Sequence, residues 1–383
     1  MSQPALVLIT TSFPIQGDGS EAAGGFVADL VEELAKHVPM RVVAPGAKCI
    51  IEHHSDRIEV FRYAAPQRPL STLKLWRPSD LLALGRVLIA GATATRSAAQ
   101  AGPTCHLLAL WALPSGYWAR RVSRQIGIPY STWALGSDIW SLGRIPIVRS
   151  LLRTVLREAA ACFADGVELA QDTHRIASRE VEFLPSTRAI SKSRSSPLKS
   201  EPPYRLLFLG RWHPNKGIDL LLEAMRLLSQ RDWQRIEAVE ICGGGPMEAS
   251  VRQGVAILQQ AGRPVQLQGY LDKEAAEATI LRADYLLIPS RIESIPVVFS
   301  DAIKLGCPVV STPTGDLPGL IEKFAVGVSA SEGSAAAMAE AISVAVNSAP
   351  SQFQTGLGKL ATMFSLSESI APRLLGLALG GRG

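Results

Sequence analysis

The stretch YLLIPSRIESIPVVFSDAIKLGCPVVS, residues 285–311, predicts a strand, a loop, a short helix and a second strand in direct succession. Its apolar start, residues 285–288, is typical of a buried strand in a parallel sheet. The Pro/Ser loop that follows carries Glu293, and the helix carries Asp301 before it ends at Gly306. Two carboxylates are therefore predicted at the carboxyl edge of a parallel sheet, where open α/β sheets bind ligands.

Strands and helices alternate on both sides of this stretch, and the alternation predicts parallel sheets wrapped by helices. The predicted strands are residues 6–10, 40–44, 58–63, 106–110, 130–134, 205–209, 238–242, 265–268, 285–288 and 308–311. The predicted helices include residues 26–37, 218–228, 247–261, 334–346 and 367–379.

A chain of 383 residues is too long for one ordinary domain, so two domains are predicted. Residues 190–203 are rich in Ser, Lys and Pro and are predicted to be the linker. This places an amino-terminal domain at 1–190, a carboxyl-terminal domain at 204–366 and a last helix within 367–383.

Charge is spread unevenly along the chain. Residues 1–200 contain 23 Lys/Arg and 16 Asp/Glu, whereas the remainder contains 16 and 18. A basic first half suits an anionic surface or acceptor, while no motif indicates nucleic-acid binding. The five cysteines are far apart and indicate reduced thiols in a cytoplasmic protein. Neither a signal peptide nor a membrane-spanning segment is expected.

The second half opens with LLFLGRWHPNKGI, residues 206–218, which predicts a strand, a glycine turn and a helix start. A helix start with free backbone N–H groups is an anion site, and Arg211 and Lys216 add two positive charges beside it. The alternative interpretation is a pair of solvated loop cations, but the carboxylate loop downstream favours a functional one.

Together these motifs resemble the retaining glycosyltransferases of the family 4 type, or glycosyl transferases group 1. The resemblance implies the GT-B fold, with two facing Rossmann-like domains and a central cleft. It implies three catalytic groups: Glu293 reaches the donor sugar, and Arg211 and Lys216 hold the donor diphosphate. Asp301 would hold the nucleotide ribose. The predicted last helix would cross back to the first domain.

Further donor-binding positions follow from the resemblance: Gly244, within the triglycine 243–245, and Ser294, Ile295 and Pro296 beside the first acid. A tight strand-to-helix turn explains the triglycine equally well. In the first domain the resemblance places Gly24, Gly25, Ser137 and Asp138 at the acceptor side of the cleft. For the two glycines the alternative is a plain turn, and for Asp138 it is a helix cap.

Three positions depart from the family pattern. Leu135 stands where many members have His, Asp301 replaces the usual Glu, and Gly319 stands where an acid is common. They keep open a non-catalytic nucleotide-sugar-binding subunit as an alternative, and a GT-B sugar-nucleotide epimerase is a second one. A Rossmann oxidoreductase is disfavoured, because no Gly-x-Gly-x-x-Gly follows the first strand.

No Asp-x-Asp pair occurs in the chain. Many glycosyltransferases use such a pair to hold a metal ion. Arg211, Lys216 and helix amides would then stabilise the leaving diphosphate. We therefore expect no catalytic metal and no other cofactor.

Residues 146–161 predict an amphipathic helix in which Arg149, Arg153 and Arg157 form one basic stripe. A solvated face is the first interpretation of this stripe. The second is peripheral contact with an anionic membrane or a diphosphate-linked acceptor.

The sequence thus predicts a retaining glycosyltransferase that moves a sugar from a nucleotide-diphosphate sugar to an acceptor hydroxyl. Surface polysaccharide or lipid-linked glycan assembly is the expected setting, by analogy. The expected partners are the donor and a carbohydrate or lipid-linked acceptor. The expected location is the cytoplasm or the inner face of the cell membrane.

Overall fold

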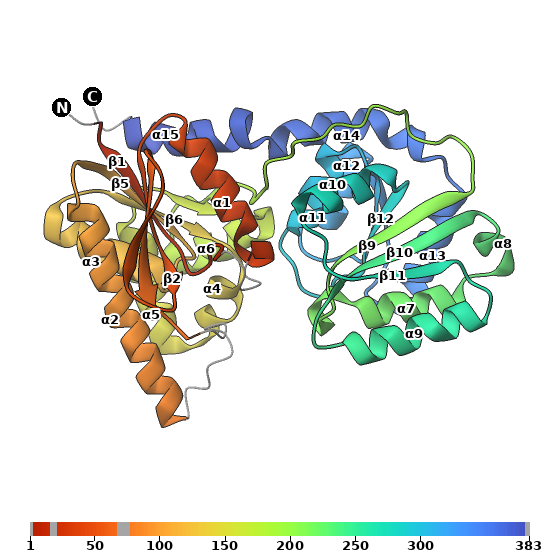
Figure 1. Cartoon of the computed structure of the whole chain (residues 1–383), viewed down its shortest axis with the longest axis horizontal. Coiled ribbons are helices and arrows are strands. Elements are labelled where there is room, and N and C mark those ends of the chain that lie inside the picture. Colours follow the sequence, from red (N-terminus) through yellow and green to blue (C-terminus); the bar gives the residue numbers. More distant parts are fainter. Residues whose placement is uncertain (1–2, 16–20, 67–76, 380–383) are drawn as a thin grey trace. The chain divides into compact units, whose positions relative to one another are not determined.

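A computed structural model describes residues 3–15, 21–66 and 77–379 of the chain. The chain divides into two units, Met1–Ala189 with Leu366–Gly383, and Ile190–Ser365. Each unit is a sheet of mostly parallel strands with helices on its faces (Figure 1). The predicted α/β class with two Rossmann-like domains is confirmed.

The first unit holds an eight-stranded sheet in the order β3-β4-β2-β1-β5-β6-β7-β8. All neighbours are parallel except β3 and β4. The strands are β1 (Ala5–Ile9), β2 (Met40–Gly46), β3 (Ile50–Ser55), β4 (Ile58–Ala64), β5 (Thr104–Leu110), β6 (Tyr130–Ala134), β7 (Cys162–Ala164) and β8 (Glu182–Phe183). Strand β3 was not predicted, because its side chains are mostly exposed and its sequence, IIEHHS, lacks a buried apolar face.

Helices cover both faces of this sheet, and each face has its own apolar core. One core lies under α2, α3, α5 and α6, and the other lies under α1 and α15. The helices of this unit are α1 (Glu21–Ala35), α2 (Pro78–Gln100), α3 (Ser115–Ile126), α4 (Ser137–Trp140), α5 (Pro146–Glu158), α6 (Val167–Ala177) and α15 (Ala371–Leu379).

Helix α1 begins earlier than residue 26, where the sequence pattern placed its start. Gly24 and Gly25 therefore lie inside the helix and do not form a loop before it. Gly24 is suited to this place because a Cβ there would stand 2.7 Å from Pro14, so only glycine lets the chain pack so closely. Part of the predicted glycine loop, residues 16–20, lies outside the described residues.

The second unit has a six-stranded, fully parallel sheet in the order β11-β10-β9-β12-β13-β14. Its strands are β9 (Tyr204–Arg211), β10 (Ile236–Gly244), β11 (Val265–Gln268), β12 (Tyr285–Ile288), β13 (Val309–Ser311) and β14 (Gly327–Ser329). Its main helices are α7 (Ile218–Leu227), α8 (Gln230–Trp233), α9 (Glu248–Gln260), α10 (Lys273–Arg282), α11 (Val297–Lys304), α12 (Leu317–Phe324), α13 (Ala335–Val346) and α14 (Gln354–Ala361). The strand order reverses between β9 and β12, and ligands of open α/β sheets bind at such a switch point.

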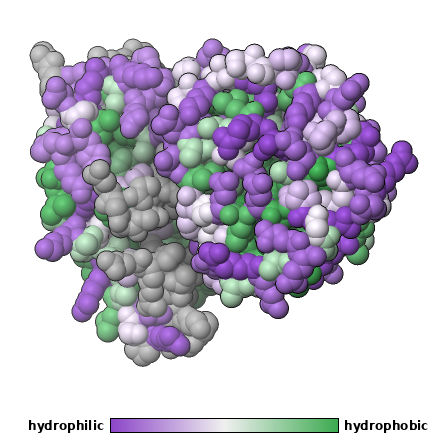
Figure 2. Space-filling view, turned by 45° about the vertical axis from the view of Figure 1, so that its right-hand side comes forward, coloured by the Kyte–Doolittle hydropathy of each residue, from purple (hydrophilic) through white to green (hydrophobic). Residues whose placement is uncertain are grey.

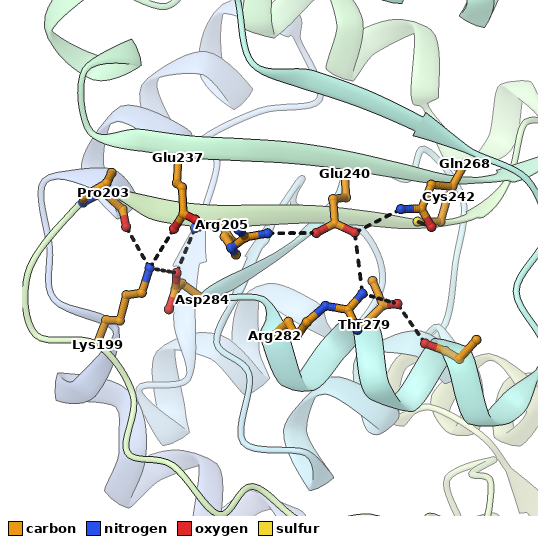
Figure 3. Close-up of polar contacts among 11 residues, drawn as sticks. Lys199, Pro203, Arg205, Glu237, Glu240, Cys242, Gln268, Thr279, Arg282 and Asp284 are labelled. Carbon is orange, nitrogen blue, oxygen red and sulfur yellow. Dashed lines mark hydrogen bonds and ion pairs between the residues drawn. The ribbon is translucent and has the colours of Figure 1, made fainter.

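A chain of polar contacts braces the start of β9 against β10 and α10 (Figure 3). Arg205 on β9 pairs with Glu237, at 2.5 Å, and with the buried Glu240, at 3.5 Å, both on β10. Glu240 also lies 3.9 Å from Arg282 of α10. Lys199, in the predicted linker, extends this series of ion pairs by pairing with Glu237 at 3.0 Å. The segment before β9 is therefore attached to the second unit.

The carboxyl-terminal segment belongs to the first unit. A π-helical turn, Leu366–Ile370, leads into α15, and both add buried side chains to the core under α1. Within the described ranges, no helix is long and apolar enough to cross a membrane.

Candidate active site

Two loops at the carboxyl edge of the second sheet form the centre of the candidate site. One follows β9 and ends at Gly217, where α7 begins; the other follows β12 and ends at Pro296, where α11 begins. Strands β9 and β12 are hydrogen-bonded neighbours, so their carboxyl ends place the two loops next to each other.

The two loops bring Lys216 and Glu293 into direct contact. The Lys216 ammonium donates a hydrogen bond to Glu293 Oε1, although the residues are 77 positions apart in the sequence. The two side chains are 32% and 18% exposed, so the pair is half-buried but open to a ligand. A cation and a carboxylate side by side suit the junction between a sugar and its phosphate, where hydroxyl groups meet negative charge.

Arg291 fastens one loop to the other. Its guanidinium makes a two-pronged ion pair with Asp219 in the first turn of α7, at 2.8 and 2.9 Å. The same side chain donates to the Pro214 carbonyl at 2.7 Å, and its backbone N–H donates to the Asn215 carbonyl at 2.8 Å. Hydrogen bonding to Asp219 raises the pKa of Arg291 further. Both loops are therefore held in one arrangement.

Gly217 allows the two loops to approach closely. It has a φ of 66°, and a Cβ there would stand 1.8 Å from the Pro289 carbonyl oxygen. Gly315 does the same on the other side of the Glu293 loop, with a φ of 51° and a Cβ position 2.3 Å from the Glu293 carbonyl oxygen. Glycine is required at both places.

The predicted donor-binding residues Ser294, Ile295 and Pro296 continue the Glu293 loop. Ser294 and Ile295 are buried, and Pro296 is the residue before the first turn of α11. Within the described parts of the chain, the Ser294 hydroxyl is buried without a hydrogen-bond partner. An unpaired buried hydroxyl is costly, and the donor-binding role of Ser294 stays a prediction.

Asp301 lies in α11, and its carboxylate is buried. Its Oδ1 stands 3.8 Å from the ammonium of Lys304, one turn further along the helix. The structure thus places Asp301 in the second turn of α11 with a cation beside it. Its predicted contact with the ribose stays a prediction.

The triglycine packs against the end of β9. A Cβ at Gly243 would stand 1.9 Å from the Gly210 carbonyl oxygen, and one at Gly245 would stand 2.8 Å from the Trp212 carbonyl oxygen. Gly244 lies under the ring of Tyr270, whose hydroxyl donates to the Gly244 carbonyl at 2.6 Å. Close contacts within the protein therefore account for Gly243 and Gly245, and the donor-binding role of Gly244 stays a prediction.

Arg211 is the last residue of β9, and its side chain is exposed. Its guanidinium makes no ion pair with any residue that the structure describes. It is therefore a free positive charge at the same sheet edge as Lys216 and available to an anionic ligand.

In the first unit, Gly25 faces Arg188. A Cβ at Gly25 would stand 3.7 Å from the Arg188 guanidinium, an ordinary contact distance. Arg188 lies 4.0 Å from Asp29, which also accepts a hydrogen bond from the Ala189 N–H at 2.8 Å. The amino-terminal part of α1 thus carries an arginine next to its glycines.

Ser137 and Asp138 begin α4, after Gly136 with a φ of 105°. Asp138 is buried, and its carboxylate also accepts hydrogen bonds from the backbone of Asp138 and Ile139 in the first turn of α4. It accepts hydrogen bonds from the backbone N–H groups of Ala112, at 2.6 Å, and Leu135, at 3.3 Å. Burial raises the pKa of Asp138 to about 6, against the opposing effect of these hydrogen bonds. Asp138 ties together the turns after β5 and β6.

The arginines of the predicted basic stripe of α5 are exposed, as expected of a solvated face, and each also donates to a backbone carbonyl. Arg153 and Arg157 donate through Nε to the carbonyls of Ile176 and Ala177, the last residues of α6, at 3.1 and 3.2 Å. Arg149 donates to the Gly143 carbonyl at 3.4 Å. These arginines satisfy helix-end carbonyls, which interact favourably with cations.

Sequence reasoning assigned no role to three residues of this edge, Arg291, Asp219 and Tyr270. Arg291 stood inside the quoted stretch, and its partner Asp219 lies in the first turn of the helix after the Lys216 loop. Tyr270 lies two residues after the end of β11, so its position after a strand end was the available signal. Among the described residues, no group of three or more His, Cys, Asp or Glu side chains is placed to hold a metal ion.

Comparison with known proteins connects this site to a family. Residues 203–348 match the family described as glycosyl transferases group 1. The amylovoran biosynthesis glycosyltransferase AmsK of Erwinia amylovora is 33% identical over 145 residues, which are 36% of this chain and 34% of AmsK. The D-inositol 3-phosphate glycosyltransferase of Corynebacterium diphtheriae is 24% identical, covering 92% of this chain and 88% of that protein.

Solved structures extend the likeness to the whole fold. Sucrose-phosphate synthase from Thermosynechococcus elongatus superposes with a TM-score of 0.72, with 18% identity and 98% of both chains covered. The Anabaena protein HepE in complex with UDP-glucose superposes with a TM-score of 0.67, with 16% identity and 98% of both chains covered. At these identities the likeness establishes the fold, and the reaction has to be inferred from the residues of the site.

Proposed function

We propose that this chain, which matches the glycosyl transferases of group 1 over residues 203–348 and has the GT-B fold, transfers a sugar from a nucleoside diphosphate sugar to an acceptor hydroxyl with retention of the anomeric configuration. The observation that carries the proposal is the contact between Lys216 and Glu293 at the switch point of the second sheet. Arg211, free and exposed on the same edge, is the second cation of the proposed diphosphate site.

In the proposed reaction, the bond between the anomeric carbon and the leaving phosphate oxygen breaks. The acceptor oxygen bonds to the anomeric carbon from the same face, and its proton passes to the leaving phosphate. Negative charge grows on the diphosphate during this step. Lys216, Arg211 and the N–H groups at the start of α11 are the groups that stabilise it. Glu293 holds the sugar hydroxyls and fixes Lys216 before the donor binds. In this scheme no metal is needed.

The donor is proposed to carry a nucleoside diphosphate such as UDP, since HepE is described in complex with UDP-glucose. AmsK is named for amylovoran biosynthesis, which supports a role in polysaccharide assembly. We propose a carbohydrate or lipid-linked acceptor and a cytoplasmic location, including the inner face of the cell membrane.

A melting experiment with ligands tests the donor site. UDP, GDP, ADP and their sugars are added separately, and a ligand that binds only the folded protein raises the melting temperature. The active donor is then incubated with acceptors, and proton NMR of the product shows whether the anomeric configuration is kept. A melting shift without any transfer identifies a binding subunit, and conversion of the donor alone into its epimer identifies an epimerase.

A further inference from the structure

The first sheet has a switch point of its own, between β1 and β5. Strand β1 pairs with β2 on one side and with β5 on the other, in parallel with both. Helix α1, which follows β1, packs on one face of the sheet, and α2, which precedes β5, packs on the other. Ligands of open α/β sheets bind outside the carboxyl ends of the strands at such a point. The residue that directly follows β5 there is Trp111.

Trp111 has a strained backbone. Its φ is 65°, in the left-handed region that bulky residues rarely adopt. Glycine would adopt the same φ without this strain. The turn alone therefore does not require a tryptophan, and strained residues of this kind concentrate at ligand-binding sites.

Three hydrogen bonds hold the strained turn in place. The Trp111 N–H donates to the Trp133 carbonyl at 2.9 Å, and the Trp111 carbonyl accepts from the Gly116 N–H at 3.3 Å. The next N–H, that of Ala112, donates to the buried Asp138 carboxylate at 2.6 Å. Asp138 is one of the residues that the resemblance placed at the acceptor side, so the turn of Trp111 is anchored to that predicted site.

The indole of Trp111 is half-buried beside the ring of Phe26 on α1. The two ring centroids lie 6.4 Å apart with an interplanar angle of 63°, an edge-to-face contact that fixes the orientation of the indole. Both rings pack against the core under α1 and remain partly exposed. Phe26 directly follows Gly25, which the resemblance also placed at the acceptor side. Trp111 therefore connects the two groups of predicted acceptor-side residues.

Partial exposure of an apolar side chain is by itself unremarked in this chain. On the face drawn in Figure 2, hydrophobic residues form small patches among hydrophilic ones. Trp111 differs because a strained turn, held by a buried carboxylate, keeps its ring at a switch point of the sheet. Leu135 is bound to the same carboxylate, whose Oδ1 accepts from its N–H at 3.3 Å, and adds a second half-buried apolar side chain at this edge.

We propose that Trp111 is a specificity-determining residue that binds a pyranose ring of the acceptor by stacking. A pyranose has a face of C–H groups that packs on a flat aromatic ring, while its hydroxyl groups stay free to form hydrogen bonds. A bare lipid phosphate has no flat face of this kind, so the acceptor presents a sugar ring to Trp111. This inference rests on the proposed transfer reaction and names the class of its acceptor.

Saturation-transfer NMR tests the stacking without turnover. The full chain is mixed with UDP and, in turn, with the methyl pyranosides of glucose, galactose and mannose, and the aromatic resonances of the protein are irradiated. Saturation is expected to pass to the C–H protons of one face of the sugar ring. Trp111→Gly keeps the left-handed turn and removes the indole, so it is expected to weaken pyranoside binding about tenfold. Trp111→Phe keeps a flat ring and is expected to retain most of the binding.

The matched control is Tyr117→Ala, which removes a half-buried aromatic ring of α3 that packs on the opposite core. It is expected to leave pyranoside binding unchanged. Equal losses in Tyr117→Ala and Trp111→Gly, or no saturation of any pyranoside by the parent, overturn the proposal. A Trp111→Gly protein that binds pyranosides like the parent also overturns it, because the indole then serves packing alone.

Kinetics separate the stacking from the proposed reaction. With an active donor and acceptor, Trp111→Gly is expected to raise the acceptor KM about tenfold and to leave the melting shift with the donor unchanged. Transfer to a bare polyprenyl phosphate that is insensitive to Trp111→Gly overturns the stacking. Pyranoside binding that depends on Trp111, in a protein that transfers no sugar, supports the stacking and contradicts the proposed reaction.

Discussion

At the scale of single residues, the contact between Lys216 and Glu293 gives the site its character. Each partner lowers the cost of keeping the other charged and half-buried without a ligand. A donor diphosphate competes with Glu293 for the lysine, so binding exchanges one anionic partner for another and does not have to dehydrate a free ammonium.

The first prediction concerns the cations. Lys216→Ala and Arg211→Ala are each expected to cost about 2–4 kcal/mol of transition-state stabilisation, because each removes a charge that opposes the leaving diphosphate. The measurement is kcat/KM for transfer with the active donor, with Lys323→Ala on α12 as a surface-lysine control. Transfer is expected to continue in EDTA. If EDTA abolishes it and magnesium or manganese restores it, a metal carries the charge.

The second prediction separates the two acids. Glu293→Gln keeps the size and removes the charge, so it is expected to cut kcat and leave nucleotide affinity nearly unchanged. Asp301→Ala is expected to weaken nucleotide affinity by about 1–2 kcal/mol, through lost hydrogen bonds to the ribose. Calorimetric titration with the nucleotide and steady-state kinetics distinguish the two effects. If the Glu293→Gln protein turns over like the parent, Glu293 does not act on the reacting sugar.

The third prediction concerns pH and Asp138. Burial raises the pKa of Asp138 to about 6 from its ordinary value of 3.8, so the folded state binds the proton more tightly than the unfolded state. The contribution of Asp138 to the free energy of unfolding is therefore greatest at low pH and falls as pH rises from about 4 to 6. Denaturant unfolding of the parent and Asp138→Asn across this range is expected to show the parent losing stability relative to the variant as pH rises.

His106 acts in the opposite direction over the same range, because burial lowers its pKa to about 4. It is present in both proteins, so it cancels in the comparison. A difference between parent and variant that stays constant with pH contradicts the assignment to Asp138.

At the scale of elements, the close approach of the two site loops depends on Gly217. Gly217→Ala and Gly262→Ala both place a side chain at a φ near +70°, which costs about 1–2 kcal/mol. At Gly262 the added Cβ meets nothing within 4 Å, whereas at Gly217 it stands 1.8 Å from the Pro289 carbonyl oxygen. The fourth prediction is that Gly217→Ala destabilises more than Gly262→Ala and that only Gly217→Ala weakens donor binding. Urea unfolding and the ligand melting shift measure both effects, and equal behaviour of the two variants would contradict it.

Sequence patterns predicted elements where burial is strong. Strands β6 and β12 have the predicted bounds, because all of their residues are buried. Strand β11 also has the predicted bounds, although only Val265 of its four residues is buried. The meeting of the Lys216 and Glu293 loops follows from the pairing of β9 with β12, and the sequence motifs did not predict that strand order. The hydrogen bond between Asp138 and the backbone of Ala112 could not be predicted from the sequence. Ala112 lies 26 residues away, and every residue except proline has a backbone N–H, so the residue type carries no signal.

At the scale of the whole molecule, α15 completes the core of the first unit. Leu374 is buried in the same core as side chains of β1 and α1. The fifth prediction is that Leu374→Ala destabilises this unit by about 2–5 kcal/mol. Hydrogen–deuterium exchange is expected to rise in β1 and α1 and to stay unchanged in β9 and β12. Leu360→Ala on α14, buried in the second unit, is expected to give the reverse pattern. Uniform loss of protection in either variant contradicts independent cores.

The return of residues 366–379 to the first unit fixes an order of events during translation. The second unit is a continuous segment, so all of its strands have left the ribosome before α15 exists. The first unit emerges earlier yet keeps an apolar face of β1 and α1 uncovered until the last helix arrives, more than 170 residues after β8. At about 5–20 residues per second this wait lasts roughly ten to forty seconds. Newly made chains are therefore most exposed to chaperones and proteases in their first half, although that half is synthesised first.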